Sequence, residues 1–230
     1  MSKVAVVTGA SRGIGREICK ELANKGHHAI AVARSEKPLT TLANSYSNIS
    51  AIPTDLTDQK DVDKLITQLK NDFSTVDILI NNAGALINKS FKELTLDDWR
   101  SQLESNLISA VHITKEMLSL FSNNAHIINI SSMGGFQGSA KFPGLAAYSV
   151  SKGALSILTE CLSVELSDKS IKANALCLGA VQTEMLEEAF PGIEAPLTAQ
   201  EMGSYIANFA IEGSAFYNGK ILPVALEDPE

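Results

Sequence analysis

The sequence predicts an α/β fold in a single domain, built on a doubly wound sheet of seven parallel strands. Short apolar runs alternate with helix-length segments along the whole chain, which is the pattern of βαβ units. Several runs show no alternation of apolar and polar residues, as expected where helices cover both faces of a strand. The 230 residues, 45% of them hydrophobic, are enough for one large core. The predicted strands are residues 4–7, 28–33, 50–53, 78–80, 127–130, 173–178 and 221–224.

Helical segments separate these strands. The predicted helices are residues 14–25, 39–46, 62–73, a long helix from residue 95, 148–166 and 198–210. Thr95 and Asp98 fit a capping box at the start of the long helix, with Leu94 and Trp99 as its hydrophobic staple. Residues 184–196 contain two prolines and a glycine, and predict a flexible lid or substrate loop.

Two helices carry apolar stripes at three- or four-residue spacing. In the long helix the stripe is Trp99, Leu103, Leu107, Ala110, Thr114, Met117 and Phe121, with Asn106 beside it. In the helix at 148–166 it is Leu155, Leu158, Leu162 and Leu166. Long amphipathic helices of this kind also suit packing against a second subunit, so we expect a homo-oligomer, a dimer or a tetramer.

Charge and composition disfavour several classes of partner. The net charge of −7, without any basic run, argues against nucleic-acid binding. No apolar run approaches the roughly 20 residues of a membrane-spanning helix, and the first residues enter a strand without a cleavable signal, so we expect a cytoplasmic protein with no membrane partner. Cys19, Cys161 and Cys177 lie far apart in apolar surroundings, which predicts buried thiols and no metal site.

A glycine-rich turn follows the first predicted strand. It reads Thr8-Gly9-Ala10-Ser11-Arg12-Gly13-Ile14-Gly15 and leads directly into a helix. Glycines allow backbone to approach a pyrophosphate, and the helix N-terminus offers free N–H groups and the positive end of its dipole. The spacing Gly-x3-Gly-x-Gly differs from the commoner dinucleotide fingerprint. The turn predicts nucleotide binding, and a ligand-free strand-to-helix turn is the alternative.

A second group of polar residues surrounds the fifth predicted strand. The strand ends at Ser131 and Ser132, and a later helix opens with Tyr148 and carries Lys152 one turn on. Residues four apart share one face of a helix, so the phenol and the ammonium can act on the same small volume. That volume lies beyond the carboxyl end of a strand, where open α/β sheets bind their ligands. Taken alone, the same spacing also fits an ordinary surface pair.

Together these motifs resemble the short-chain dehydrogenase/reductase family. The turn from Thr8 to Gly15 matches the family's Thr-Gly-x3-Gly-x-Gly, Asn81-Asn82-Ala83-Gly84 matches its Asn-Asn-Ala-Gly, and Tyr148-x3-Lys152 matches its catalytic pair. Asn106 matches the family's helix asparagine, and the likeness runs from residue 8 to about residue 183. It implies a Rossmann-type oxidoreductase with a cofactor-binding half at about 1–125 and a catalytic and substrate-binding half at about 126–230.

The resemblance also implies the roles of four residues. Tyr148 would protonate the alkoxide formed by hydride transfer, Lys152 would stabilise the phenolate and bind the nicotinamide ribose, Ser132 would orient the carbonyl, and Asn106 would hold a relay water. A phenol with a pKa of about 10 needs a shift of about three units to work near pH 7, and a neighbouring cation shifts it in that direction. Ser131 competes with Ser132 for its role, and Asn106 could instead bind the backbone of a neighbouring loop.

The same resemblance gives the cofactor contacts. The residues directly after the second strand, Arg34 and Ser35, include no acid, so Arg34 together with Arg12 is expected to pair a 2′-phosphate, which favours NADP(H) over NAD(H). Asp55 is expected at the adenine, with helix capping as its alternative. Asn82, Ala83 and Gly84 are expected along the adenosine ribose, or else form an ordinary strand-end turn. The cofactor-binding candidates are Gly9, Ser11, Arg12, Gly13, Ile14, Gly15, Arg34, Asp55, Leu56, Asn82, Ala83, Gly84, Tyr148, Lys152 and Thr183.

Three departures from the family pattern bear on the substrate. Ser132 and Tyr148 are 16 positions apart, about three more than is usual in the family, so residues 133–145 form a longer loop. Leu178-Gly179 stands where the family has Pro-Gly, and the segment 222–228 lacks the usual Asp-Gly-Gly. We predict an NADPH-dependent reductase of a small or acyl carbonyl, with a non-catalytic dinucleotide-binding or sensor protein as the alternative.

Overall fold

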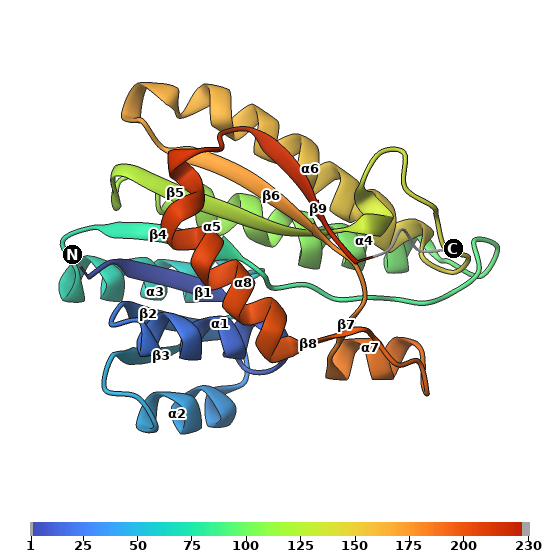
Figure 1. Ribbon diagram of the computed structural model, residues 1–230, viewed down its shortest axis with the longest axis horizontal. Helices are drawn as coiled ribbons and strands as arrows, with labels where there is room; N and C mark the ends of the chain where they lie inside the picture. Colours follow the sequence, from blue (N-terminus) through green and yellow to red (C-terminus); the bar gives the residue numbers. More distant parts are fainter. Residues whose placement is uncertain (1, 227–230) are drawn as a thin grey trace.

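A seven-stranded parallel sheet forms the centre of the molecule (Figure 1). The computed structural model describes residues 2–226. Its strand order is β3-β2-β1-β4-β5-β6-β9, so the single α/β domain and the seven parallel strands predicted from the sequence are confirmed. The strands are β1 (Val4–Thr8), β2 (His28–Ala33), β3 (Ile49–Pro53), β4 (Val76–Asn81), β5 (Phe121–Ser132), β6 (Lys172–Leu178) and β9 (Lys220–Val224). The order reverses between β1 and β4, which is where doubly wound sheets bind ligands.

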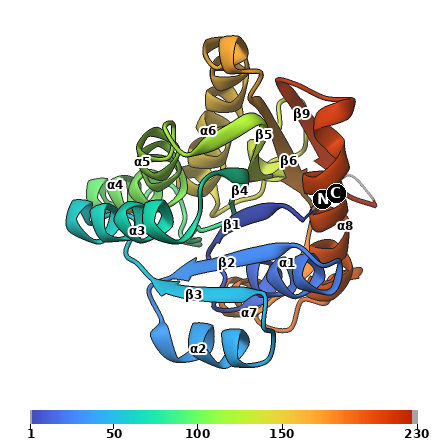
Figure 2. The same ribbon diagram turned by 90° about the vertical axis from the view of Figure 1, so that its left-hand side faces the viewer.

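Helices cover both faces of the sheet (Figure 2). The helices are α1 (Gly13–Asn24), α2 (Glu36–Asn44), α3 (Gln59–Asp72), α4 (Leu96–Leu103), α5 (Ser109–Glu116), α6 (Ala146–Glu165), α7 (Glu184–Ala189) and α8 (Ala199–Glu212). Apolar side chains of α1, α2 and α8 pack on one face of the sheet, and those of α3, α5 and α6 pack on the other. This two-sided burial explains why the strands read as continuous apolar runs.

Several element boundaries differ from the prediction because the residues concerned carry no apolar pattern. β5 begins at Phe121, six residues before the predicted start. The additional residues are mostly polar, so they lie outside the apolar run from which the strand was predicted. Phe121 therefore belongs to a strand and not to the helical stripe. α3 begins at Gln59 behind the cap Asp58, whose side chain accepts a hydrogen bond from the Asp61 backbone N–H. A separate pair of two-residue strands, β7 (Val181–Gln182) and β8 (Leu197–Thr198), is too short to leave any periodic pattern.

The long helix is interrupted by a π turn. The predicted capping box of Thr95 and Asp98 is present, and α4 continues through a π-helical turn, Glu104–Ile108, into α5. In α4 and the π turn the buried side chains are Gln102 and Asn106, whereas the predicted stripe residues Trp99, Leu103 and Leu107 are only half-buried. The prediction of one continuous apolar stripe is therefore wrong for the first half of the helix.

The inner face of α6 is also more polar than predicted. Leu155 is buried as expected, but Leu158, Leu162 and Leu166 are half-buried. The remaining buried positions on the helix are Ala147, Ser151, Lys152, Ser156, Thr159 and Ser163. Val150, Ile157 and Val164 recur every seven residues on its exposed side. The helix therefore turns hydroxyl groups toward the sheet and an apolar row toward solvent.

Two buried amide side chains and a buried hydroxyl form a chain of hydrogen bonds that links two strands and α6. Asn81 Nδ2 donates to Asn129 Oδ1 at 2.8 Å, and Asn129 Nδ2 donates to Thr159 Oγ1 at 2.8 Å. Asn129 and Thr159 are fully buried, and Asn81 nearly so. Buried polar groups need such partners, so the three side chains join β4, β5 and α6 at fixed positions.

The remaining predictions concern the thiols and the chain end. Cys19 and Cys177 are buried, but Cys161 is exposed on α6, which corrects the prediction of three buried thiols. Residues 2–226 include no helix that is both long enough and apolar enough to cross a bilayer. In the segment 222–228, which lacks the family's Asp-Gly-Gly, residues 227 and 228 lie outside the described part of the chain.

Candidate active site

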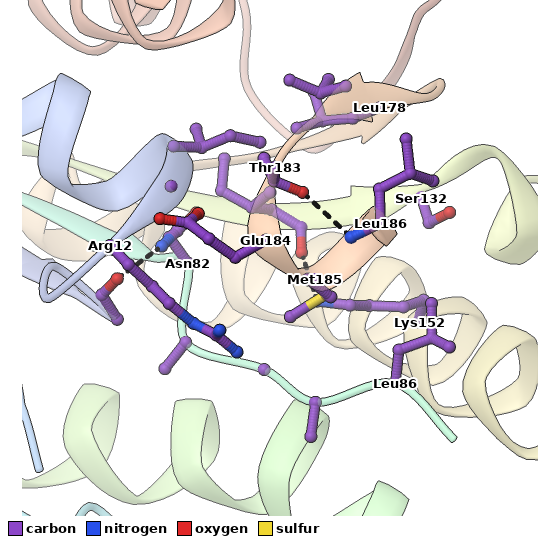
Figure 3. Close-up of a pocket in the computed structure, with 18 of the residues that line it drawn as sticks. Arg12, Asn82, Leu86, Ser132, Lys152, Leu178, Thr183, Glu184, Met185 and Leu186 are labelled. Carbon is purple, nitrogen blue, oxygen red and sulfur yellow. Dashed lines mark hydrogen bonds between the residues drawn. The ribbon is translucent and has the colours of Figure 1, made fainter. Parts of the chain in front are cut away.

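One cavity of about 1090 Å³ lies at the carboxyl ends of the strands and brings the two predicted motifs together. Of the predicted site residues, those on its wall are Gly9, Ser11, Arg12, Gly13, Ile14, Arg34, Asp55, Leu56, Asn82, Ala83, Gly84, Ser132, Tyr148, Lys152 and Thr183. Gly15 and Asn106 are not on the wall. Figure 3 shows Arg12 and Asn82 at one side of this space and Ser132 and Lys152 at the other.

The glycine-rich turn is packed tightly against the end of β4. Gly9 has φ +69°, and a Cβ there would lie 2.9 Å from the Ala83 Cα. A Cβ on Gly15 would lie 2.5 Å from both the Gly9 oxygen and the Asn82 Nδ2. Only glycine tolerates the backbone angle at position 9 and the close contact at position 15. Gly15 therefore shapes the turn from behind, without reaching the cavity.

Thr8 and Asn82 hold this turn in place, and Thr8, although it opens the matched motif, was not among the predicted site residues. The Thr8 hydroxyl donates to the Ile80 carbonyl and accepts from the backbone N–H groups of Asn82 and Ala83, both at 3.0 Å. The Asn82 side chain donates to the Thr8 carbonyl at 2.9 Å. The sequence signal that could have identified Thr8 is a hydroxyl at the last position of an apolar strand.

The two serines at the end of β5 have different surroundings. The Ser131 hydroxyl donates to the Lys152 carbonyl at 2.9 Å and accepts from the Ser156 hydroxyl at 3.0 Å. Its proton is therefore already used in a hydrogen bond within the protein. Ser132 is only half-buried, and its oxygen accepts from the Gly134 backbone N–H at 3.2 Å. Its own proton remains available to a ligand in the cavity. This difference favours Ser132 over Ser131.

Lys152 is a buried cation at the inner end of the cavity. Its side chain is 4% exposed, its Nζ donates to the Ile130 carbonyl at 2.8 Å, and it lies 5.9 Å from the centre of the Tyr148 ring. Burial lowers the pKa of Lys152 to about 8. At neutral pH the side chain is therefore still mostly charged, next to the phenol.

The pKa of Tyr148 moves in the direction opposite to the one expected. Burial of the phenol raises its pKa, and the neighbouring Ser132 hydroxyl opposes that rise. The desolvation of the phenolate is the larger of these two effects. The phenol is consequently protonated at neutral pH.

The Asn106 side chain is fully used within the protein. Its Oδ1 accepts from the Ala85 N–H at 2.8 Å, and its Nδ2 donates to the Ala85 carbonyl at 3.0 Å and to the Ser151 hydroxyl at 2.9 Å. The loop-binding alternative left open by the sequence is thus observed. Asn106 lies in the π turn, and such turns often mark functional sites.

At the other end of the cavity, Asp55 does not cap a helix. Its carboxylate accepts hydrogen bonds from the Thr57 backbone N–H and hydroxyl, which hold the pKa of Asp55 below its usual value. The cap of α3 is Asp58, so the capping alternative for Asp55 is wrong. Arg34 is exposed at the rim, whereas Arg12 forms an ion pair with Glu188 of α7.

The segment after Thr183 covers part of the cavity. It begins with the short helix α7, which Thr183 caps by accepting from the Leu186 N–H at 3.2 Å (Figure 3). Asn88 Nδ2 donates to the Ala189 carbonyl at 3.0 Å, which joins α7 to the loop after β4. Among the apolar wall residues that the sequence did not single out are Leu86, Met133, Phe142, Leu145, Met185, Leu186, Phe190 and Ile193. They come from three separate segments, one of which includes the helix α7, without any shared pattern.

Comparisons with known proteins agree with this arrangement. The model of the short chain dehydrogenase family matches residues 3–194. A 3-oxoacyl-[acyl-carrier-protein] reductase of Haemophilus influenzae is 31% identical, with 96% of each chain covered. An oxidoreductase of Botryotinia fuckeliana is 30% identical over 91% of this chain and 76% of its own. A solved structure of a Serratia marcescens short-chain dehydrogenase/reductase, a double mutant, superposes with a TM-score of 0.87 at 29% identity, covering 97% of this chain and 96% of its own.

The family match spans most of the chain, and it includes both the glycine-rich turn and the Tyr148–Lys152 pair. The chain therefore belongs to the short-chain dehydrogenase family, and it is an oxidoreductase of a family that uses nicotinamide dinucleotides.

Proposed function

We propose that the protein is an NADPH-dependent carbonyl reductase with Tyr148 as general acid. The main support is that Ser132, Tyr148 and Lys152 line the same cavity as the glycine-rich turn. An electrophilic carbonyl carbon near these side chains would lie within reach of a nicotinamide bound along the strand ends. The substrate is a small molecule, and reduction converts its carbonyl to an alcohol.

The residues present fit a dinucleotide. The cavity extends from Arg34 after β2 to Lys152 on α6, and the first turn of α1 meets it at Gly13 and Ile14. Among the described residues no side chain caps α1, so its first backbone N–H groups have no side-chain acceptor and would donate to a phosphate. The bound cofactor would supply the hydride. Thr183 keeps its hydroxyl proton for the carboxamide, and Asp55 and Leu56 would hold the adenine.

The protein's part of the chemistry is to handle the proton. As the carbonyl oxygen gains negative charge, Tyr148 gives up its phenolic proton and Ser132 donates a hydrogen bond that positions the oxygen. The Lys152 ammonium stabilises the phenolate that remains. Because the Asn106 side chain is bound to Ala85 and Ser151, we assign the relay water to the Asn106 backbone carbonyl.

Cofactor choice rests on the two arginines at the rim. Arg34 and Arg12 both line the cavity, and the two residues directly after β2, Arg34 and Ser35, offer no carboxylate to a ribose 2′-hydroxyl. Charge-assisted hydrogen bonds to a 2′-phosphate are worth roughly 1.5–3 kcal/mol, which is about a ten- to hundredfold preference for NADPH. NAD(H) is the less favoured cofactor.

The substrate end of the cavity favours an apolar molecule. Its wall is formed by Phe142 and Leu145 of the longer loop and by Met185, Leu186 and Phe190 of the covering segment. We therefore propose a ketone, aldehyde or acyl carbonyl with an apolar body. The proposal also includes a cytoplasmic location and a homo-oligomer.

The test measures NADPH oxidation by the purified protein with ketones, aldehydes, quinones and 3-oxoacyl thioesters as substrates. The dissociation constants of NADPH and NADH are measured in parallel. We expect turnover on at least one apolar carbonyl and tighter NADPH binding. NADH binding as tight as NADPH contradicts the cofactor assignment. Tight NADPH binding without turnover on any substrate supports the non-catalytic sensor instead.

A further inference from the structure

Arg12 is occupied by a carboxylate of the same chain. Its Nη1 and Nη2 both donate to the Glu188 carboxylate, with 3.2 Å between Nη2 and Oε2. Glu188 lies on α7, in the segment that covers the cavity. A two-pronged pair of this kind uses the same fork of N–H groups that would bind a phosphate, so the guanidinium cannot fully serve both partners.

We propose that Glu188 competes with the 2′-phosphate of NADPH for Arg12 and thereby limits the preference for NADPH over NADH; this inference rests on the NADPH site proposed above. Arg34 is free of this competition, because it makes no ion pair within residues 2–226. The two arginines thus contribute differently. Arg34 is available to the phosphate at once, whereas Arg12 must first leave Glu188.

The acidic face of α7 is directed at the glycine-rich turn. Glu184 stands one helical turn before Glu188, and its Oε2 lies 3.5 Å from the point that a Cβ on Gly13 would occupy. Glu187, between them, accepts from the Gly192 N–H instead. The Arg12–Glu188 hydrogen bond is the largest cause of the raised pKa of Arg12 and of the lowered pKa of Glu188. Glu188 is therefore the specific partner of Arg12.

Replacing Glu188 should leave α7 in place. The helix keeps its cap at Thr183, and Asn88 still holds the Ala189 carbonyl at its other end. An effect of Glu188→Gln on cofactor affinity then reports on Arg12 and not on the loss of the covering segment. Circular dichroism and the melting temperature verify that the variant is folded.

The test measures dissociation constants for NADPH and NADH in wild type and Glu188→Gln. The side chains of Arg12 and Glu188 are 48% and 63% exposed, so their ion pair is weak, and NADPH binding should tighten only about two- to fivefold. NADH affinity should not change, because NADH lacks the 2′-phosphate. Glu194→Gln is the matched control: it removes the same charge from the exposed part of this segment and should leave both affinities unchanged.

A double variant tests whether Arg12 mediates the effect. In an Arg12→Ala background, Glu188→Gln should no longer tighten NADPH binding. The inference is overturned if Glu188→Gln leaves NADPH affinity unchanged, if NADH tightens as much as NADPH, or if Glu194→Gln has the same effect. Wild-type protein that binds NADPH no better than NADH contradicts the NADPH site itself. A clear NADPH preference that Glu188→Gln does not alter contradicts only the competition.

Discussion

The burial of Lys152 lowers its pKa and should therefore make the proposed reaction depend on pH. The buried ammonium has a pKa of about 8, well below the ordinary value for lysine, because burial disfavours its charged form. A lysine is charged below its pKa, so the cation beside Tyr148 is present at neutral pH and is lost as the pH rises through about 8. Lys152 can stabilise the phenolate only below that value.

We therefore expect kcat/KM for carbonyl reduction to fall as the pH rises above about 8. At saturating cofactor this quantity reports the ionisation of the enzyme–cofactor complex that binds the carbonyl, so its alkaline limb should follow Lys152. The measurement is a pH profile with saturating cofactor, accompanied by the NADPH dissociation constant at each pH as a control. A profile that stays flat to pH 10 would show that the charge of Lys152 is not needed.

Tyr148→Phe tests the proposed acid. The variant keeps the buried ring but removes the proton donor, so turnover should fall by about 10²- to 10⁴-fold while NADPH binding changes little. Tyr205→Phe, at a partly exposed ring outside the cavity wall, is the control and should retain activity. Retained turnover in the Tyr148 variant would remove this residue from the mechanism.

The site residues differ in how visible they are from sequence. Tyr148, Lys152 and Ser132 could be predicted because a strand end and a helical spacing of four place them together. The binding of Asn106 to Ala85 could not, because its partner is the backbone of a loop without periodicity. Glu188 escaped notice because its partner, Arg12, lies far away in the chain.

At the scale of elements, the π turn between α4 and α5 changes what the helix presents to the sheet. An α-helical stripe assumes 3.6 residues per turn, and a wider turn shifts the positions that follow it relative to those before. Ala110, Thr114 and Met117 are buried as predicted, whereas Gln102 before the π turn and Asn106 within it take the inner positions. Periodicity alone cannot reveal a local change in the helix itself.

The capping box of α4 should contribute measurably to stability. Thr95 accepts from the Asp98 N–H and Asp98 accepts from the Thr95 N–H, which satisfies two free donors at the helix start. Thr95→Ala should lower the free energy of unfolding by about 1 kcal/mol in urea titrations. Thr40→Ala, at an exposed position inside α2, is the control and should be neutral or slightly stabilising. Equal losses in both variants would mean that the box adds nothing.

At the scale of the whole molecule, the parallel sheet was predictable because burial on both faces leaves long apolar runs. All seven strands were identified, but the polar start of β5 and the two-residue strands β7 and β8 were missed because they carry no apolar pattern. The prolines and glycine of residues 184–196 predicted a lid or substrate loop, but not that the segment begins with a helix, α7, held by contacts with distant parts of the chain.

The exposed row on α6 should form a subunit interface. Val150, Ile157 and Val164 are 52%, 58% and 72% exposed, and an apolar row on a long helix is typical of a contact surface. Ile157→Lys should lower the mass of the particle measured by light scattering after size exclusion. Thr40→Lys, on α2 at the other edge of the sheet, is the control and should keep the wild-type mass. A monomeric wild type would contradict the proposed oligomer.

The hydrogen-bonded chain from Asn81 through Asn129 to Thr159 favours one register of β5 against β4. A shift of β5 by two residues against β4 would still face its apolar side chains into the same layers. It would, however, separate Asn81 from Asn129 and leave buried amides unpaired, at about 1–3 kcal/mol for each. Ser132 follows Asn129 by three positions and Asn82 follows Asn81 directly. The pairing of two side chains outside the cavity thus determines how far the serine hydroxyl stands from the turn proposed to hold the cofactor.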